Sequence, residues 1–128
     1  MKILLDTHAF LWWVMDDPKL SVKAKKLLKD SDHEFFLSVV SAWEIAIKSR
    51  LKKISLSKKA EDFVLEQMDL NSISPLSIQM KHALHVEKLP DHHEDPFDRL
   101  IVAQAHLENM ALLTCDKMIK KYDVNSLW

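Results

Sequence analysis

Two aspartates, Asp95 and Asp98, stand one helical turn apart at the start of the segment HHEDPFDRLIVAQAHL, residues 92–107. Asp95 is a typical N-cap residue, and Pro96 suits the first helical position. Asp98 falls in the first turn, where a carboxylate interacts favourably with the helix dipole. Capping therefore explains both residues when they are considered alone, but three other acids favour a second interpretation.

These three acids, Asp6, Glu44 and Asp116, also have ordinary structural interpretations. Asp6 and Asp116 each follow a short apolar segment and could cap the next helix. Glu44 could pair with Lys48, one turn later. However, an open parallel sheet binds ligands outside the carboxyl ends of its strands, which is where Asp6 and Asp116 are expected. Helices that begin at the same edge would bring Glu44 and Asp98 to the same crevice.

Four carboxylates around one crevice would repel one another strongly unless a cation neutralised them. A set of oxygen ligands without cysteine or histidine partners suits Mg²⁺ or Mn²⁺. Such sites are typical of metal-assisted phosphodiester cleavage, in which the ion activates water and stabilises charge on the phosphate. The acids therefore predict metal-dependent chemistry on a phosphodiester substrate.

Apolar and amphipathic segments that alternate along the chain must position these acids. Strands are expected at residues 2–5, 34–38, 71–76 and 111–114. Helices are expected at residues 7–17, 21–30, 40–53, 57–69, 77–89, 96–108 and 116–122. Continuous apolar strands that alternate with helices predict a parallel sheet covered on both faces. No repeat or linker is present, so we expect one domain over residues 1–128.

The composition excludes several kinds of protein. The chain has no glycine, which excludes the glycine-dependent phosphate loops of Walker A and Rossmann proteins. Its first apolar run ends at Asp6, too early for a signal peptide or a membrane span. The single Cys115 cannot form an internal disulfide, so we expect a cytoplasmic protein without membrane association.

Charge gives no overall attraction to nucleic acid, because the net charge is −1. Lysine and arginine nonetheless cluster in residues 23–29 and 48–59. Each cluster is either an ordinary solvated helix face or a strip that faces phosphates. The sequence leaves both interpretations open.

Four segments also carry a family resemblance: MKILLDTHAFLWW, SVVSAWEIAIK, DPFDRLIVAQA and LLTCD. In this order and spacing they resemble the successive motifs of PIN-domain ribonucleases, specifically the VapC-type toxins of bacterial toxin–antitoxin pairs. The resemblance covers nearly the whole chain. It implies a PIN-like three-layer α/β/α sandwich with a central parallel sheet of about four to five strands.

For the site, the resemblance implies that Asp6, Glu44, Asp98 and Asp116 are catalytic and hold one or two Mg²⁺ or Mn²⁺ ions. The reaction it implies is endonucleolytic hydrolysis of RNA that leaves a 5′-phosphate and a 3′-hydroxyl. Asp95 matches the first acid of its motif, where it would either cap the helix or bind metal. Small polar residues would orient carboxylates or waters around the ions: Thr7, Ser41 and Thr114.

Other positions near these motifs have less specific interpretations. Arg99 stands in a first helical turn, where a cation is unfavourable, so we expect a bond to a nearby carboxylate or a contact with substrate phosphate. His92 and His93 are expected to be solvated rather than to bind metal. Cys115 has no activating partner in sequence and is not expected to be catalytic. Asn109, where many relatives have glycine, would have to adopt any left-handed conformation.

The resemblance also implies partners, namely a second copy of the chain, a cognate antitoxin and RNA, with a higher toxin–antitoxin assembly as an extension. The antitoxin would cover the acidic site. Apolar residues occupy nearly every side of the segment AFLWWVM, residues 9–15. We therefore expect one of Trp12 and Trp13 to pack into a partner, unless local loops bury both.

Several other function classes remain open. One is a non-catalytic PIN-type module that binds RNA or protein, and another is a PIN nuclease outside a toxin–antitoxin pair. A haloacid-dehalogenase-like phosphatase needs a second aspartate two positions after Asp6, where this chain has His8. A receiver domain needs a phosphoacceptor aspartate after a central strand, where this chain has Ser38. The RNA target is not encoded in any feature we can read.

Overall fold

The computed structural model describes residues 1–128, and five strands form one sheet in the order β3-β2-β1-β4-β5. The strands are β1 (Lys2–Leu5), β2 (Glu34–Ser38), β3 (Ile73–Leu76), β4 (Ala111–Leu113) and β5 (Ser126–Leu127). Every neighbouring pair is parallel. The predicted parallel sheet is therefore confirmed, and the carboxyl ends of all its strands lie at one edge.

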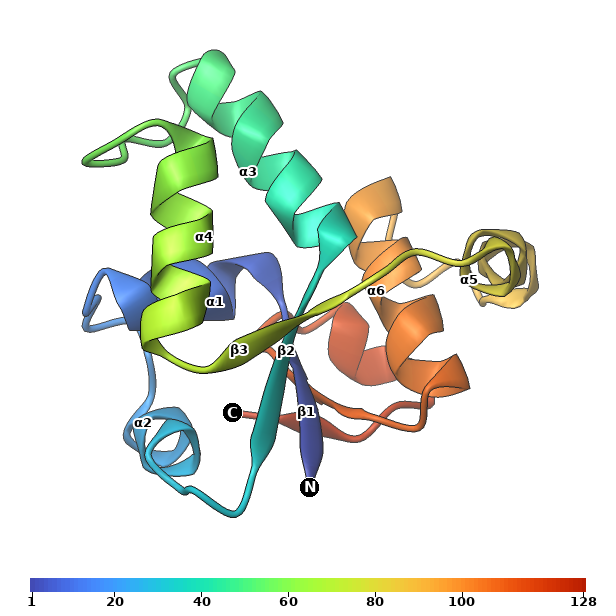
Figure 1. Ribbon diagram of the computed structural model, residues 1–128. Helices are drawn as coiled ribbons and strands as arrows, with labels where there is room; N and C mark the ends of the chain where they lie inside the picture. Colours follow the sequence, from blue (N-terminus) through green and yellow to red (C-terminus); the bar gives the residue numbers. More distant parts are fainter.

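Helices cover both faces of this sheet. They are α1 (Thr7–Val14), α2 (Val22–Leu28), α3 (Val39–Arg50), α4 (Ala60–Leu70), α5 (Met80–His85) and α6 (Pro96–Leu107), with 3₁₀ turns η1 (Val86–Lys88) and η2 (Ile119–Lys121). Figure 1 shows α1, α2 and α4 on one side of the strands and α6 on the other, with α5 beyond α6. This arrangement is the expected three-layer sandwich.

The central strand β1 anchors both halves of the core. Ile3 and Leu5 belong to the cluster beneath α1 and α4, whereas Leu4 belongs to the cluster beneath α6. All three side chains are fully buried, and each contributes about 1.5–3 kcal/mol of hydrophobic stabilisation. The alternation follows from the two-residue period of a strand. The residue directly after β1, Asp6, is therefore held firmly in place.

Two predicted helices end early, and each end is followed two residues later by a residue with a left-handed backbone conformation. The helix expected over 7–17 ends at Val14, and Asp16 has a φ of 51°. The helix expected over 40–53 ends at Arg50, and Lys52 has a φ of 58°. Asn109 has a φ of 53°, as expected. A chain without glycine must place such turns on other residues, at some cost in backbone energy.

Other boundaries differ because local signals are weak there. The helix expected over 57–69 begins only at Ala60, with no side-chain cap from Lys59. The region 77–89 is divided between α5 and η1, and the region 116–122 contains only the turn η2. Strand β5 was not predicted, because it has only two residues and no apolar run precedes it.

Both tryptophans of α1 are half-buried within the chain itself. Trp12 meets Trp128 edge to face at a centroid distance of 5.7 Å, and Trp13 meets Phe35 at 5.6 Å. Each ring packs against another aromatic side chain of the same chain but keeps part of its surface exposed, so packing of one of them into a partner stays a prediction. None of the helices combines the length and apolarity that crossing a bilayer requires.

Candidate functional site

The strand order brings two of the predicted acids to the centre of the sheet edge. Asp6 directly follows β1, and Asp116 follows β4, which pairs with β1. The chain leaves β1 toward β2 on one side, whereas β4 lies on the other side. Such a point, where neighbouring connections diverge, opens a crevice in which parallel α/β proteins bind ligands.

Asp6 is almost completely buried, with 4% of its surface exposed. Its Oδ1 accepts a hydrogen bond of 2.6 Å from the backbone N–H of Ala9, so Asp6 caps α1 as well as facing the crevice. Burial raises the pKa of this carboxyl group, although hydrogen bonds from Thr114 and Ala9 oppose the shift. The Asp6 carboxylate is therefore oriented by hydrogen bonds but poorly solvated.

Glu44 reaches the same crevice from the second turn of α3 and is equally buried. Its Oε1 lies 2.7 Å from Thr7 Oγ1, which lies 2.9 Å from Ser41 Oγ. A carboxylate can only accept, so the single Thr7 proton goes to Glu44 and Ser41 can donate to Thr7. Lys48 Nζ lies 2.5 Å from Oε2, which is the expected i, i+4 pair. Both oxygens of Glu44 are thus oriented.

Asp98 lies in the first turn of α6, and its pKa is far above the ordinary value of an aspartate. Burial, together with the charges of Asp95, Glu44 and Asp6, raises its pKa to about 7, against the attraction of His93. Asp6 and Glu44 therefore act electrostatically on Asp98, and Asp116 acts on Asp6. The crevice therefore gathers carboxyl groups around Asp98, which burial leaves poorly solvated.

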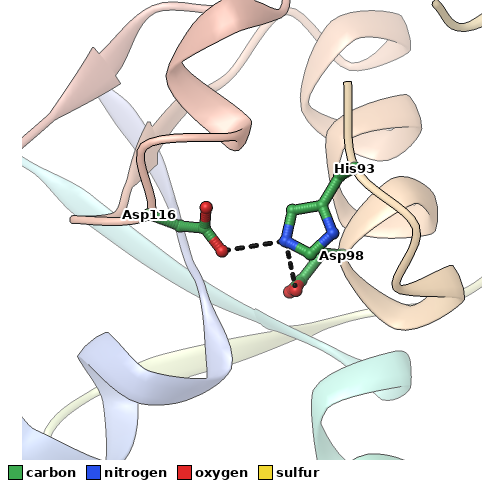
Figure 2. Close-up of side chains that lie close together, drawn as sticks. All are labelled: His93, Asp98 and Asp116. Carbon is green, nitrogen blue, oxygen red and sulfur yellow. Dashed lines mark hydrogen bonds and ion pairs between the residues drawn. The ribbon is translucent and has the colours of Figure 1, made fainter. Parts of the chain in front are cut away.

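His93 lies between two of these acids, and the expectation that it is merely solvated is wrong. Figure 2 shows its ring between Asp98 and Asp116, with Nε2 3.2 Å from Asp98 Oδ2 and 2.9 Å from Asp116 Oδ2. Nδ1 accepts the backbone N–H of Asp95, so a neutral ring carries its proton on Nε2. Ligand atoms of these three side chains all lie within 4.8 Å of one another.

Asp116 is oriented by the turn in which it stands. Its Oδ1 accepts the backbone N–H of Met118 at 2.8 Å, and its own N–H donates to Thr114 Oγ1 at 3.0 Å. Burial alone would raise the pKa of Asp116, but the hydrogen bonds from His93 and Met118 outweigh it and lower this pKa. Asp116 is therefore an ionised carboxylate at neutral pH.

Asp95 caps α6, as the sequence predicts. Its Oδ1 accepts the backbone N–H groups of Phe97 at 2.8 Å and Asp98 at 3.3 Å. Its charge contributes to the raised pKa of Asp98. Metal ligation by Asp95 itself stays a prediction.

Arg99 does not point its guanidinium at the acids. It donates to the backbone carbonyls of Val86 at 2.9 Å, Leu89 at 3.3 Å and Pro90 at 2.9 Å, and to the Tyr122 hydroxyl at 3.2 Å. The expected carboxylate partner is only Asp91, at 3.7 Å and fully exposed. These bonds connect the loop that carries His93 to α6. A contact between Arg99 and substrate stays a prediction, and it is less favoured because the guanidinium is already bonded within the chain.

The Cys115 thiol is half-buried beside the site. Burial, followed by the charge of Asp6, raises its pKa, so the thiol stays protonated at neutral pH. A protonated thiol is a poor nucleophile. This agrees with the expectation that Cys115 takes no part in catalysis.

Comparisons with known proteins agree with this fold. A family model described as PIN domain matches residues 3–125. Ribonuclease VapC22 of Mycobacterium tuberculosis is 27% identical over 121 residues, which are 94% of this chain and 91% of that protein. Among solved structures, VapBC2 from Rickettsia felis, bound to a DNA fragment from its promoter, has a TM-score of 0.73 at 16% identity, with 99% of this chain and 98% of that chain covered.

A toxin–antitoxin complex from Klebsiella pneumoniae has a TM-score of 0.65 at 15% identity, and 98% of this chain and 96% of that chain are covered. At these identities the solved structures show a common fold. The family match rests on the sequence itself.

Proposed function

This chain belongs to the PIN-domain family, and on that premise we propose that it is a Mg²⁺- or Mn²⁺-dependent endoribonuclease that acts as the toxin of a type II toxin–antitoxin pair. The observation that supports the proposal most is the group of Asp98, Asp116 and His93, whose ligand atoms lie within 4.8 Å of one another, with the buried acids Asp6 and Glu44 acting electrostatically on Asp98. The name of the curated relative, a ribonuclease, points to RNA as the substrate class.

The donor set fits a divalent cation. Buried carboxylates supply hard oxygen ligands, which suit Mg²⁺ and Mn²⁺. Burial raises the pKa of Asp98 most, and the charges of neighbouring acids raise it further. A bound cation would offset both effects, because it favours the ionised carboxylate. His93 would be an acceptable further ligand for Mn²⁺. When bound to the four acids, the ion would supply activation of water and neutralisation of charge on the scissile phosphate.

The other residues of the site hold these carboxylates in place. Thr7 and Lys48 each engage one oxygen of Glu44, and the Ala9 N–H engages Asp6. Thr114 accepts the backbone N–H of Asp116. Ligands fixed in this way need little reorganisation when an ion and a substrate bind, which is how supporting hydrogen bonds contribute to metal sites. Hydrolysis would leave a 5′-phosphate and a 3′-hydroxyl.

We extend the proposal to partners and location. The similar solved structures are toxin–antitoxin complexes, so we assign this chain a cognate antitoxin. Crowded carboxylates would attract a cationic side chain of that antitoxin as they attract a metal ion. The proposal also includes that the chain forms a homodimer, that residues 1–128 are a single domain, and that the protein is cytoplasmic.

Cleavage of RNA by antitoxin-free protein tests the proposal. A structured RNA pool is incubated with Mg²⁺ or Mn²⁺, with an EDTA control, and the cut ends are mapped. We expect cuts that require the ion and disappear in Asp6→Asn, but persist in Asp62→Asn, which changes an exposed acid of α4. Equal cutting by the wild type and Asp6→Asn, or binding of RNA without any cutting, would favour the non-catalytic alternative. Rescue of growth by a co-expressed antitoxin tests the toxin role.

A further inference from the structure

A cleft of about 440 Å³ lies between α1 and α3, directly beside the acids. Thr7 and Lys48 both line it, and each is bonded to an oxygen of Glu44. None of the four acids lines the cleft, but these two lining residues place Glu44 directly behind its wall. A chain seated in the cleft would pass next to the acids.

The cleft has an apolar floor that includes Leu11 and Ile45, and lysines stand around it. Lys48 is paired with Glu44, so the lysines left for a ligand are Lys19 and Lys53. Lys19 and Lys53 line it together with Lys48, and Asp17 is the one carboxylate in its lining. Asp17 is engaged locally, because its Oδ1 accepts the backbone N–H of Lys19 at 2.9 Å. Since the whole chain has a net charge of −1, a local group of cations beside the acids is what a polyanion would need to bind here.

Lys53 reaches the cleft because of the way in which α3 ends. Lys52 takes a left-handed conformation, with its N–H bonded to Ser49 O at 3.1 Å. The N–H of Lys53 then bonds to Lys48 O at 2.9 Å. These two bonds form a Schellman motif, which turns the chain back over the last turn of the helix. The motif brings Lys53 back to the wall that Lys48 occupies.

The opposite wall, on α1, is aromatic. The Trp12 ring lies 5.6 Å from the His8 ring, centroid to centroid, and the Lys19 ammonium lies 5.7 Å from the Trp12 centroid. A cation over an aromatic face is held without losing its ability to bind a phosphate. Cationic grooves with aromatic side chains are typical of sites that bind single-stranded nucleic acid.

We propose that this cleft binds the phosphodiester backbone of the single-stranded RNA segment adjoining the scissile phosphate, with Lys19 and Lys53 as phosphate contacts. The inference rests on the proposed nuclease function. It also assigns the basic segment 48–59 in part, since Lys48 and Lys53 face the cleft whereas Lys58 pairs with Glu66. The lysines of α2 are outside the cleft lining.

Salt-dependent binding of RNA tests this assignment. A fluorescent single-stranded oligoribonucleotide is first tested for cleavage by the wild type with Mn²⁺. It is then titrated in EDTA, so that binding is measured without cutting. The test variant is Lys19→Gln/Lys53→Gln. The matched control is Lys26→Gln/Lys29→Gln, which removes the same charge from exposed positions at the C-terminal end of α2 and its C-cap. Thermal unfolding and Mn²⁺ binding of both variants are checked against the wild type.

We expect the test variant to bind RNA about tenfold more weakly and the slope of log K against log salt to fall by about 1.4. The control should keep the slope of the wild type. Unchanged affinity and slope in the test variant would overturn the inference, and the cleft would then be assigned to an acidic protein segment. Cleavage of RNA by the wild type would still support the nuclease proposal in that case. A wild type that neither binds nor cuts RNA would refute both.

Discussion

The Nε2 atom of His93 lies 2.9 Å from Oδ2 of Asp116, so the loop before α6 is bonded to the loop after β4. The same nitrogen lies 3.2 Å from Asp98. Because it lies between the two carboxylates, this N–H offsets part of the charge of both. His93 therefore stabilises the site when it is empty of metal.

Replacement of His93 by alanine should lower the free energy of unfolding of the metal-free protein by about 1–2 kcal/mol, because Asp98 and Asp116 lose a charge-assisted hydrogen bond. Urea unfolding in EDTA measures the loss. His92→Ala is the neighbouring control, since His92 contacts Tyr122 but bonds to no carboxylate, and it should cost about 0.5 kcal/mol. Equal losses in the two variants would show that the bonds of His93 contribute nothing.

The stability of the metal-free protein should fall as the pH rises from 5 to 8. The folded state holds the pKa of Asp98 at about 7, whereas its ordinary value is 3.8, so between these values only the folded state keeps the proton. The stability that this proton gives is complete below the lower pKa and is lost as the pH rises through the higher one. The loss between pH 5 and pH 8 is on the order of 3 kcal/mol.

Urea unfolding at several pH values in EDTA measures this dependence. Asp98→Asn should show a clearly flatter profile, because the group that takes up the proton is gone. A wild type that is more stable at pH 8 than at pH 5 would contradict the assignment of a protonated Asp98.

Thr7→Val should reduce RNA cleavage by about 10- to 100-fold without weakening RNA binding, because Glu44 loses the hydrogen bond that orients it. Valine has nearly the same shape as threonine, so the change opens no cavity, and its effect comes from the hydrogen bonds that Glu44 and Ser41 lose. Thr7→Ser keeps the hydroxyl and should keep most of the activity. If Thr7→Val cleaves at the wild-type rate, the orientation of Glu44 does not depend on this bond.

Ser38→Ala should destabilise the protein by about 2–3 kcal/mol, since it removes the cap of α3 and the donor to a buried amide. Ser38 Oγ lies 3.0 Å from Val40 N and 2.5 Å from Gln104 Oε1, and both side chains are fully buried. Ser21→Ala removes only the cap of α2 and should cost about 1 kcal/mol. Chemical denaturation of the two variants should preserve this order.

Much of the fold follows from local sequence signals. The strands Lys2–Leu5 and Glu34–Ser38 are short apolar runs, and α6 begins where Asp95 and Pro96 predict. Boundaries without such signals differ, most clearly at the C-terminus, where β5 exists because it pairs with β4. Pairing of this kind depends on tertiary contacts that a two-residue segment does not encode by itself.

The site was predictable where strand ends fixed its residues, and less so in loops. Asp6 and Asp116 follow strands, so the parallel sheet alone brings them together. His93 stands in a polar loop without periodicity, and its position depends on Arg99, which binds the carbonyls of that loop. Only the folded chain relates these residues. The position of Lys53 could not be predicted either. It depends on the left-handed conformation of Lys52, and the sequence has no glycine there to indicate such a turn.

Binding of Mn²⁺ to the metal-free protein tests the central proposal, that these acids form a divalent-cation site. Free Mn²⁺ is followed by electron paramagnetic resonance during titration of the wild type, Glu44→Gln and the exposed control Glu61→Gln. We expect Glu44→Gln to weaken binding at least about tenfold and the control to bind as the wild type does. Equal affinity in all three proteins, or no binding by the wild type, would contradict the assignment of the acids to a metal ion.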